Sequence, residues 1–293
     1  MSRLPHCLVH AFLSGLAATA LACGPAKEAS GTGGTQRLAS ATVLTDRILW
    51  DLGEPTRERV VAVSTMADDP RYSDAADLWP AAIPRVGGQA ESLIARRPDV
   101  VFLASFSAQE TRAMLEQAEV KVVVLDAFRG FQDYREHVET VAQAVGAVPA
   151  GAKVIQDFDD RLARLRAPEG GERPTVVSWS DGHVPARATT FHDIATAAGL
   201  TNLPAREGLE GHVRVSVETM VTWDPDMVVL ACAPGPKGCA KATAAFAGTE
   251  GLGALRAVKQ GGVVAIDAAI LSSVGPGMLD AVETLRHRGP ADG

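Results

Sequence analysis

The chain has 293 residues, of which 46% are hydrophobic and 22% charged, a globular composition that excludes a disordered or fibrous protein. This length is sufficient for two lobes that each bury a core. The net charge of -7 at pH 7, without clusters of Lys and Arg, argues against nucleic acid as a partner, because phosphate binding needs concentrated positive charge.

The N-terminus has the pattern of a secretion signal. Arg3 precedes an apolar stretch over residues 8–21 that is too short to span a membrane and ends in Ala-Leu-Ala-Cys. We expect a signal peptide over 1–22 and favour lipidation of Cys23 over simple cleavage before it. Residues 23–36 are rich in Gly, Ser, Thr and Ala, which predicts a flexible tether. The protein is then expected in the periplasm or at the cell surface, held to the membrane by a lipid anchor.

Short aliphatic runs alternate with amphipathic stretches in the part of the chain that follows. Strands are predicted at 37–41, 60–64, 100–104 and 122–126, with helices through Ile48 and Leu52 and through Met114 and Leu115. Strands that alternate with helices favour a parallel sheet covered on both faces. We therefore expect an N-terminal lobe over 37–130.

Strand signals stop after this lobe, and the apolar residues follow helical spacing up to Arg166. We predict a connecting backbone helix over 131–167, in which Pro149 permits a kink or break. A single helical connector favours a small rather than a wide closure of the lobes on ligand binding.

A loop rich in Gly and Pro then begins a C-terminal lobe over 168–293. Strands are predicted there at 175–179 and 261–267, with helices through Ile194 and Ala198 and from Met278 to Arg286. The predicted fold is therefore α/β, with two lobes that each have a mainly parallel central sheet flanked by helices, joined by a long backbone helix.

One segment occurs twice with the same internal spacing, at 90–104 (AESLIARRPDVVFLA) and 217–231 (VETMVTWDPDMVVLA). In both copies a glutamate opens an apolar-periodic stretch, a Pro-Asp pair ends it and aliphatic residues follow, which predicts a helix, a turn and a buried strand. Two lobes built alike would present Glu91 and Glu218 at equivalent places, which suits docking on a two-fold symmetric partner. The alternative is that Pro-Asp is ordinary loop chemistry and the glutamates merely cap helices.

The cysteines fit an oxidising compartment. Cys7 leaves with the signal and Cys23 takes the lipid, so Cys232 and Cys239 remain as an even pair that could close the loop APGPKG with a disulfide. A zinc site is the alternative, but two cysteines without histidines at ligand spacing form a poor ligand set. We therefore predict no resident metal or cofactor.

The segments 59–64 (RVVAVS), 83–105, 131–146, 189–203, 215–230 and 252–267 are spread over most of the length of the chain beyond the tether. In these segments the chain resembles the substrate-binding proteins of ABC importers for cobalamin, haem and ferric siderophores, the group with a helical backbone between the lobes. The resemblance implies a receptor rather than an enzyme, an ABC permease dimer as partner and a small-molecule metal complex as ligand. It also implies that Glu91 and Glu218 dock on basic pockets of the permease.

Loops that follow the strands are the candidates for ligand binding, because ligands lie beyond the carboxyl ends of the strands in open α/β sheets. The candidate residues are Tyr72, Phe106, Trp179, His183, His212 and Lys237, of which His212 is chosen through the family resemblance. Aromatic rings would give a macrocycle or siderophore a flat apolar surface. The alternatives are packing for Trp179, a core position for Phe106 and solvated loops for the histidines; Trp50 and Trp223, on predicted helices, are interpreted as packing.

The ligand class is predicted from the same loops. A ferric siderophore ranks first, since a catecholate needs several basic residues and these lie near the loops: Arg71, Arg187, Arg206, Arg214 and Lys237. A corrinoid, which would need only apolar and aromatic walls, ranks second. Haem ranks third, with Tyr72 as an axial phenolate and a histidine opposite. A receptor for a bare metal ion such as zinc would need converging ligands, drawn from His183, His192, His212, Asp181 and Asp193. A secreted α/β enzyme is a remote alternative, because the chain has no G-x-S-x-G, P-loop or H-E-x-x-H motif.

Overall fold

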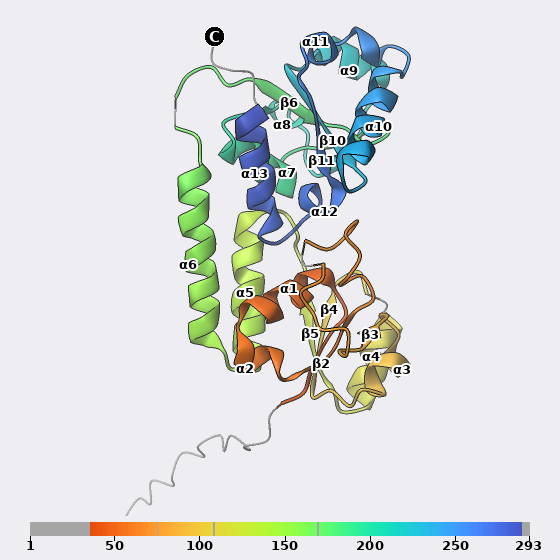
Figure 1. Ribbon diagram of the computed structural model, residues 1–293, viewed down its shortest axis with the longest axis vertical. Helices are drawn as coiled ribbons and strands as arrows, with labels where there is room; N and C mark the ends of the chain where they lie inside the picture. The colour runs from red at the N-terminus through yellow and green to blue at the C-terminus, as the bar shows by residue number, and fades with distance from the viewer. Residues whose placement is uncertain (1–35, 75, 108, 169, 289–293) are drawn as a thin grey trace, which may run out of the picture. The chain divides into compact units, whose positions relative to one another are not determined.

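The computed structural model describes residues 36–288 with the exception of residues 75, 108 and 169. The predicted signal peptide, the lipidation site at Cys23 and all of the predicted tether except Gln36 lie outside this part of the chain. The described residues belong to one compact unit and include two parallel sheets with helices around them (Figure 1). No helix among them is long and apolar enough to cross a membrane.

The first sheet has five parallel strands in the order β3-β2-β1-β4-β5. Its strands are β1 (Leu38–Ser40), β2 (Val60–Ser64), β3 (Arg85–Val86), β4 (Val100–Ala104) and β5 (Lys121–Leu125). The helices of this part are α1 (Val43–Asp51), α2 (Glu54–Arg57), α3 (Ala90–Ile94) and α4 (Gln109–Gln117). The central strands β1 and β4 are buried along their whole length, which explains the continuous apolar sequence of β4 and the Leu-Ala start of β1, although β1 ends in the buried polar residue Ser40. The four predicted strands of this lobe are confirmed, with ends within one residue.

The predicted connector is helical but consists of two helices, α5 (Phe131–Val145) and α6 (Val148–Leu165), which lie side by side (Figure 1). The division falls at Gly146, whose φ of 72° is left-handed and whose N–H bonds back to the carbonyl of Ala142. This is the usual glycine stop of a helix. Pro149 lies in the first turn of α6, where its missing N–H costs nothing. Gly151 lets the helices approach closely, because a Cβ there would lie 2.5 Å from that of Ala142.

The second sheet has four parallel strands in the order β11-β10-β6-β8, and a separate antiparallel ribbon pairs β7 with β9. The strands are β6 (Thr175–Ser178), β7 (His183–Pro185), β8 (Thr201–Asn202), β9 (His212–Arg214), β10 (Met227–Cys232) and β11 (Val263–Asp267). The helices are α7 (Thr190–Ala197), α8 (Leu203–Arg206), α9 (Val217–Trp223), α10 (Pro236–Ala247), the 3-10 helix η1 (Leu252–Ala254), α11 (Arg256–Lys259), α12 (Ala268–Leu271) and α13 (Gly277–Arg288). Both sheets are parallel, so the predicted fold class is confirmed.

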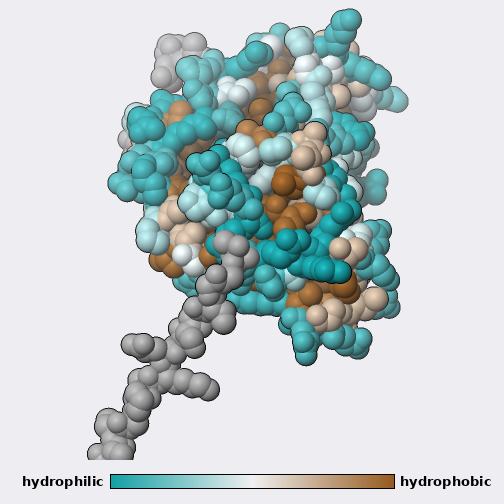
Figure 2. Space-filling model, turned by 60° about the horizontal axis from the view of Figure 1, so that its bottom comes forward, coloured by the Kyte–Doolittle hydropathy of each residue, from teal (hydrophilic) through white to brown (hydrophobic). Residues whose placement is uncertain are grey.

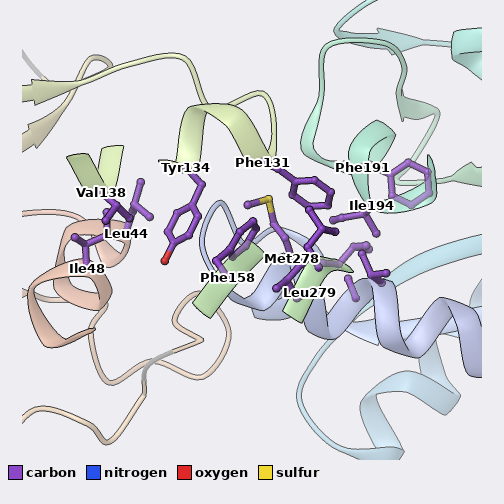
Figure 3. Packing of buried hydrophobic residues seen from close by; sticks show 14 of the residues in the cluster. Leu44, Ile48, Phe131, Tyr134, Val138, Phe158, Phe191, Ile194, Met278 and Leu279 are labelled. Atoms are coloured by element: carbon purple, nitrogen blue, oxygen red, sulfur yellow. The ribbon is translucent and has the colours of Figure 1, made fainter. Parts of the chain in front are cut away.

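One hydrophobic cluster connects the two sheets through the helices between them. Phe158 of α6 joins α6 to α5 within this cluster, because its ring centroid lies 5.7 Å from that of Phe131 and 4.8 Å from that of Tyr134, both on α5. Met278 and Leu279 of α13 belong to the same cluster, as Figure 3 shows. Because this core is shared, a large separation of the lobes would expose apolar surface. The predicted small closure agrees with this arrangement and stays a prediction.

Hydrophilic side chains cover much of the face seen in Figure 2, with apolar patches between them, as is usual for a protein surface. The large hydrophobic side chains that are exposed among the described residues are Met66, Tyr72, Phe106, Met114, Val148 and Val221. Three of these, Met66, Tyr72 and Phe106, follow β2 and β4 at the carboxyl edge of the first sheet, where sequence reasoning expects the ligand.

Candidate functional site

The repeated segment has the same structure in both lobes. Glu91 and Glu218 are each the second residue of a short helix, α3 or α9, and both side chains are exposed. A buried strand follows at the same distance, with nine positions from residue 91 to 100 and from residue 218 to 227. The predicted helix, turn and strand are therefore confirmed in both copies. A hydrogen bond with Ser216 lowers the pKa of Glu218 below its ordinary value.

The Pro-Asp half of the repeat has a structural role. Asp99 Oδ2 accepts a hydrogen bond of 2.6 Å from the backbone N–H of Arg37, just before the neighbouring strand β1. Asp226 Oδ2 accepts one of 2.8 Å from the N–H of Thr175, the first residue of the neighbouring strand β6. Burial opposes ionisation of Asp226, but the hydrogen bonds from Thr175 and the charge of Arg256 hold its pKa below the ordinary value. The aspartates thus align strands in both lobes, and the exposed glutamates are the part of the repeat available to a partner.

Tyr72 is the accessible phenol of the structure. It lies in the long loop between β2 and β3 and is 54% exposed, whereas Tyr134, the second of the two tyrosines in the chain, is buried. The guanidinium carbon of Arg71 lies 5.3 Å from the centre of the Tyr72 ring, and Arg71 is paired with Asp69 at 2.6 Å. A cation therefore accompanies the phenol at this edge.

A buried carboxyl group anchors the start of the Tyr72 loop. Asp46 in α1 is fully buried and accepts hydrogen bonds from the Ser64 N–H at 3.1 Å and the Ser64 hydroxyl at 2.5 Å, at the end of β2. Burial raises the pKa of Asp46 to about 6, although the hydrogen bonds from Ser40 and Ser64 act in the opposite direction. The indole N–H of Trp79 donates to the Asp46 carbonyl at 3.2 Å, so the same residue also holds the later part of the loop.

The Tyr72 loop is also bonded to the C-terminal lobe. Asp74 Oδ2 accepts hydrogen bonds from the hydroxyl of Ser273 at 2.8 Å and from the N–H of Gly277, the first residue of α13, at 3.0 Å. A Cβ at Gly277 would lie 2.7 Å from that oxygen, so glycine is what allows the contact. Tyr72 and Asp74 line a small hollow together with residues 272–275. The position of Tyr72 therefore depends on both lobes.

Phe106 projects into solvent from the turn after β4. It is 81% exposed, so the interpretation of this residue as core is wrong. Its ring centroid lies 5.9 Å from that of Phe128, and Phe128 lies 5.0 Å from the ring of His137. His137 is buried and its Nε2 lies 2.6 Å from the carbonyl oxygen of Asp126. The exposed Phe106 ring therefore contacts Phe128, which in turn contacts the buried His137.

The β7–β9 ribbon brings both predicted histidines together. His183 pairs with Arg214 and Pro185 pairs with His212, so these four residues share one face of the ribbon. His183, His212 and Arg214 are exposed, while Val184 between them on the other face is fully buried. The sequence alone predicts Arg214 only as one of several basic residues near loops. In both HVP (183–185) and HVR (212–214) a valine lies between two residues that point to the opposite face. This alternation is the sequence signal that could have identified the exposed face.

The other two candidates lie around α10. Trp179 is half-buried and its ring centroid lies 6.4 Å from that of Phe246 in α10, which favours the packing interpretation. Lys237 is exposed in the first turn of α10 rather than on a free loop. The predicted disulfide between Cys232 and Cys239 is present and brackets this residue, with the Cα atoms 4.8 Å apart. Trp50 and Trp223 lie on α1 and α9, as expected.

The histidines do not form the site that a bare metal ion would need. Among the described residues, the one group of three potential metal ligands within 4.8 Å of one another contains no histidine. His192 lies on α7 and not on the ribbon that carries His183 and His212, and Asp193 Oδ2 accepts a hydrogen bond from the N–H of Phe131 at 2.9 Å. The described residues therefore give no support to the alternative of a receptor for a bare metal ion.

A family model described as "Periplasmic binding protein" matches residues 38–270. The chain belongs to this family, whose members are substrate-binding receptors of ABC transporters rather than enzymes. The receptor interpretation of the sequence is thereby confirmed, as is the expectation of a periplasmic binding protein. A search of curated proteins gave no match.

Solved structures with the same fold include receptors for iron-containing ligands. The periplasmic haem-binding protein RhuT from Roseiflexus sp. RS-1, in apo form, is 23% identical with a TM-score of 0.72, over 87% of this chain and 98% of that one. The periplasmic haem-binding protein BhuT, in complex with two haems, is 26% identical with a TM-score of 0.71, over the same shares. An ABC-type Fe3+-hydroxamate transport system protein from Saccharomonospora viridis is 20% identical with a TM-score of 0.68, over 88% and 94%.

Proposed function

We propose that this protein captures haem and delivers it to an ABC permease. The observation that carries this proposal is the distribution of iron ligands: the N-terminal lobe offers the exposed phenol of Tyr72, and the C-terminal lobe offers the imidazoles of His183 and His212 on one ribbon face. Ferric haem iron accepts phenolate and imidazole as axial ligands. Tyr72 follows the carboxyl end of β2 and His183 follows that of β6, the usual position of ligands in open α/β sheets.

The neighbouring side chains suit a porphyrin. Met66 and Phe106 are exposed after β2 and β4, at the carboxyl edge of the sheet that Tyr72 also follows, and would lie against an apolar macrocycle. Arg214 shares the ribbon face with the histidines, and a guanidinium pairs readily with a propionate. RhuT and BhuT, which have the same fold, are both described as haem-binding proteins, and this supports the same choice. We therefore rank haem above a ferric siderophore and a corrinoid as the ligand. The change of order rests on the ribbon face shared by the histidines and on the exposure of Met66, which the sequence alone does not predict.

A panel of ligands tests this choice by thermal shift. We expect haem to raise the unfolding temperature, because a ligand at one hundred times its dissociation constant adds about 2.7 kcal/mol to stability. A ferric hydroxamate and a cobalamin, each at the same concentration, are the comparisons. A shift with the hydroxamate and none with haem would assign the protein to siderophores and contradict the proposal.

Glu91 and Glu218 are proposed to dock on the permease dimer. Both are exposed, both open a helix that precedes a buried strand, and they occur once in each lobe. Two equivalent carboxylates match the two equivalent subunits of a dimeric partner. Their pairing with basic side chains of the permease would guide the encounter and set its register.

Cys23 is proposed to carry the lipid that holds the receptor at the membrane. The small-residue sequence before it and the Gly- and Ser-rich sequence after it support this role. Anchoring would keep the receptor near its permease at raised local concentration. Intact-mass measurement of the native protein tests it: we expect a mature chain that begins at Cys23 with added acyl mass, and a chain of that length without lipid would contradict it.

A further inference from the structure

Three potential metal ligands meet at the carboxyl ends of β10 and β11. Cys232 and Asp267 are the last residues of these strands and are register partners, and Cys239 lies in the first turn of α10. Asp267 Oδ1 is 3.6 Å from the Sγ atom of each cysteine. The three ligand atoms all lie within 4.8 Å of one another.

The Asp267 carboxylate lies beside a disulfide that cannot donate a hydrogen bond to it. Within the described residues it has no hydrogen bond from a nitrogen or oxygen donor, and the sulfur atoms of a disulfide carry no proton to donate. A partly buried carboxylate normally has donors or a cation as partners. Two thiols, or a cation held by two thiolates, would satisfy it.

We infer that reduction of the Cys232–Cys239 disulfide creates a binding site for a thiophilic divalent cation such as Zn2+, with Cys232, Cys239 and Asp267 as its ligands. Zinc prefers thiolate and carboxylate ligands in a tetrahedral arrangement, with Zn–S distances of about 2.3 Å. Two sulfur atoms around one such ion are separated by about 3.8 Å in that geometry. Three protein ligands leave the fourth position open to water or to a donor atom of another molecule.

The redox state decides whether the site exists, because bonded sulfur atoms cannot act as thiolates. A dithiol reductant, for example a protein of the thiol–disulfide oxidoreductase class, supplies two electrons and two protons and becomes a disulfide, while Cys232 and Cys239 become thiols. Zinc then displaces one proton from each thiol, and both protons pass to solvent. Cys239 and Asp267 are half-buried and Cys232 is 4% exposed, so the ion would enter from the side of α10 and α12.

Zinc titration of the full chain tests this inference. The protein is reduced with a phosphine, freed of reductant without air and titrated with Zn2+ against a chromophoric chelator. The control is the double variant Cys232→Ser/Cys239→Ser, which retains Cys7 and Cys23 and so accounts for any zinc that they bind. We expect one additional zinc ion per reduced wild-type chain, and none for the oxidised chain, relative to this control.

Two further variants test the carboxylate. Asp267→Asn should weaken zinc binding by at least the roughly 10-fold that loss of an outer-shell partner costs, and Asp267→His should restore most of it. Cadmium in place of zinc should give an ultraviolet thiolate absorption corresponding to two thiolates. The inference is overturned if the reduced wild-type chain binds zinc no better than the double serine variant, or no better than the reduced Asp267→Asn variant. Reduction that unfolds the chain without reversal by zinc also overturns it.

Discussion

Replacing Asp74 with alanine removes the carboxylate that connects the Tyr72 loop to helix α13. The change deletes hydrogen bonds of 2.8 Å from Ser273 and 3.0 Å from the Gly277 N–H. Hydrogen bonds to charged groups contribute about 1.5–3 kcal/mol each when well shielded. Asp74 is half-buried, so we expect a loss of about 2 kcal/mol in the free energy of unfolding for the pair. The Gly277 N–H has no partner within its own helix to replace the lost one.

Urea denaturation of both proteins measures this loss. The matched control is Asp157→Ala, because the salt bridge of Asp157 with Lys153 joins side chains that are 59% and 67% exposed and should contribute less than about 0.5 kcal/mol. Asp74→Asn should fall between wild type and alanine, since an amide oxygen still accepts both bonds without charge. Haem affinity should decline with Asp74→Ala, because Tyr72 lies two residues away. An effect no larger than that of Asp157→Ala would refute the proposed link between the lobes.

Three further changes are predicted. Trp179→Ala should lower the free energy of unfolding by about 2 kcal/mol, less than the loss of a fully buried aromatic side chain, because the ring is half-buried against Phe246. Haem affinity should not change. Weaker haem binding at normal stability would instead place Trp179 in the ligand site. Burial raises the pKa of Asp46 from 3.8 to about 6, so the folded state holds this proton more tightly than the unfolded state. The resulting contribution to the free energy of unfolding is fully present below about pH 4 and is lost as the pH rises through about 6. Asp46→Asn imitates the protonated carboxyl group and does not titrate. Its free energy of unfolding relative to wild type, measured by urea denaturation at several pH values, should therefore rise by up to about 3 kcal/mol between pH 4 and 6. A difference that stays constant with pH would contradict the burial argument. Glu91→Ala combined with Glu218→Ala should abolish uptake in cells while the purified receptor binds haem normally, and normal uptake would exclude the docking role.

The sequence predicts the parts of this fold in which local pattern and burial agree. The strands 60–64 and 100–104 are apolar at every position except Ser64 because the sheet is covered on both faces, and their ends match the structure. The repeat of Glu91 and Glu218 is visible because one short helix, turn and strand is used in both lobes.

Other parts depend on contacts that a local pattern does not contain. Strands β3 and β8 have two residues each, too few for any periodicity to appear. The bond between Asp74 and Ser273 joins residues 199 positions apart. The histidines of the site could be chosen from loops, but only the pairing of β7 with β9 shows that His183 and His212 share a face with Arg214. The sequence does not decide whether Phe106 is buried or exposed, because an aromatic residue after an apolar strand gives the same local pattern in both cases.

The iron ligand is tested most directly by the visible absorption spectrum of the haem-loaded protein, compared between wild type and Tyr72→Phe. The variant keeps the ring and removes only the hydroxyl group, and Phe106→Leu serves as the control that alters another exposed aromatic side chain at the same sheet edge without changing the phenol. We expect a ferric spectrum with a phenolate-to-iron charge-transfer band in wild type and in the control. Tyr72→Phe should lose this band and bind haem at least about 10-fold more weakly, which corresponds to about 1.4 kcal/mol. An unchanged spectrum and affinity in Tyr72→Phe would contradict the assignment of Tyr72 as the iron ligand.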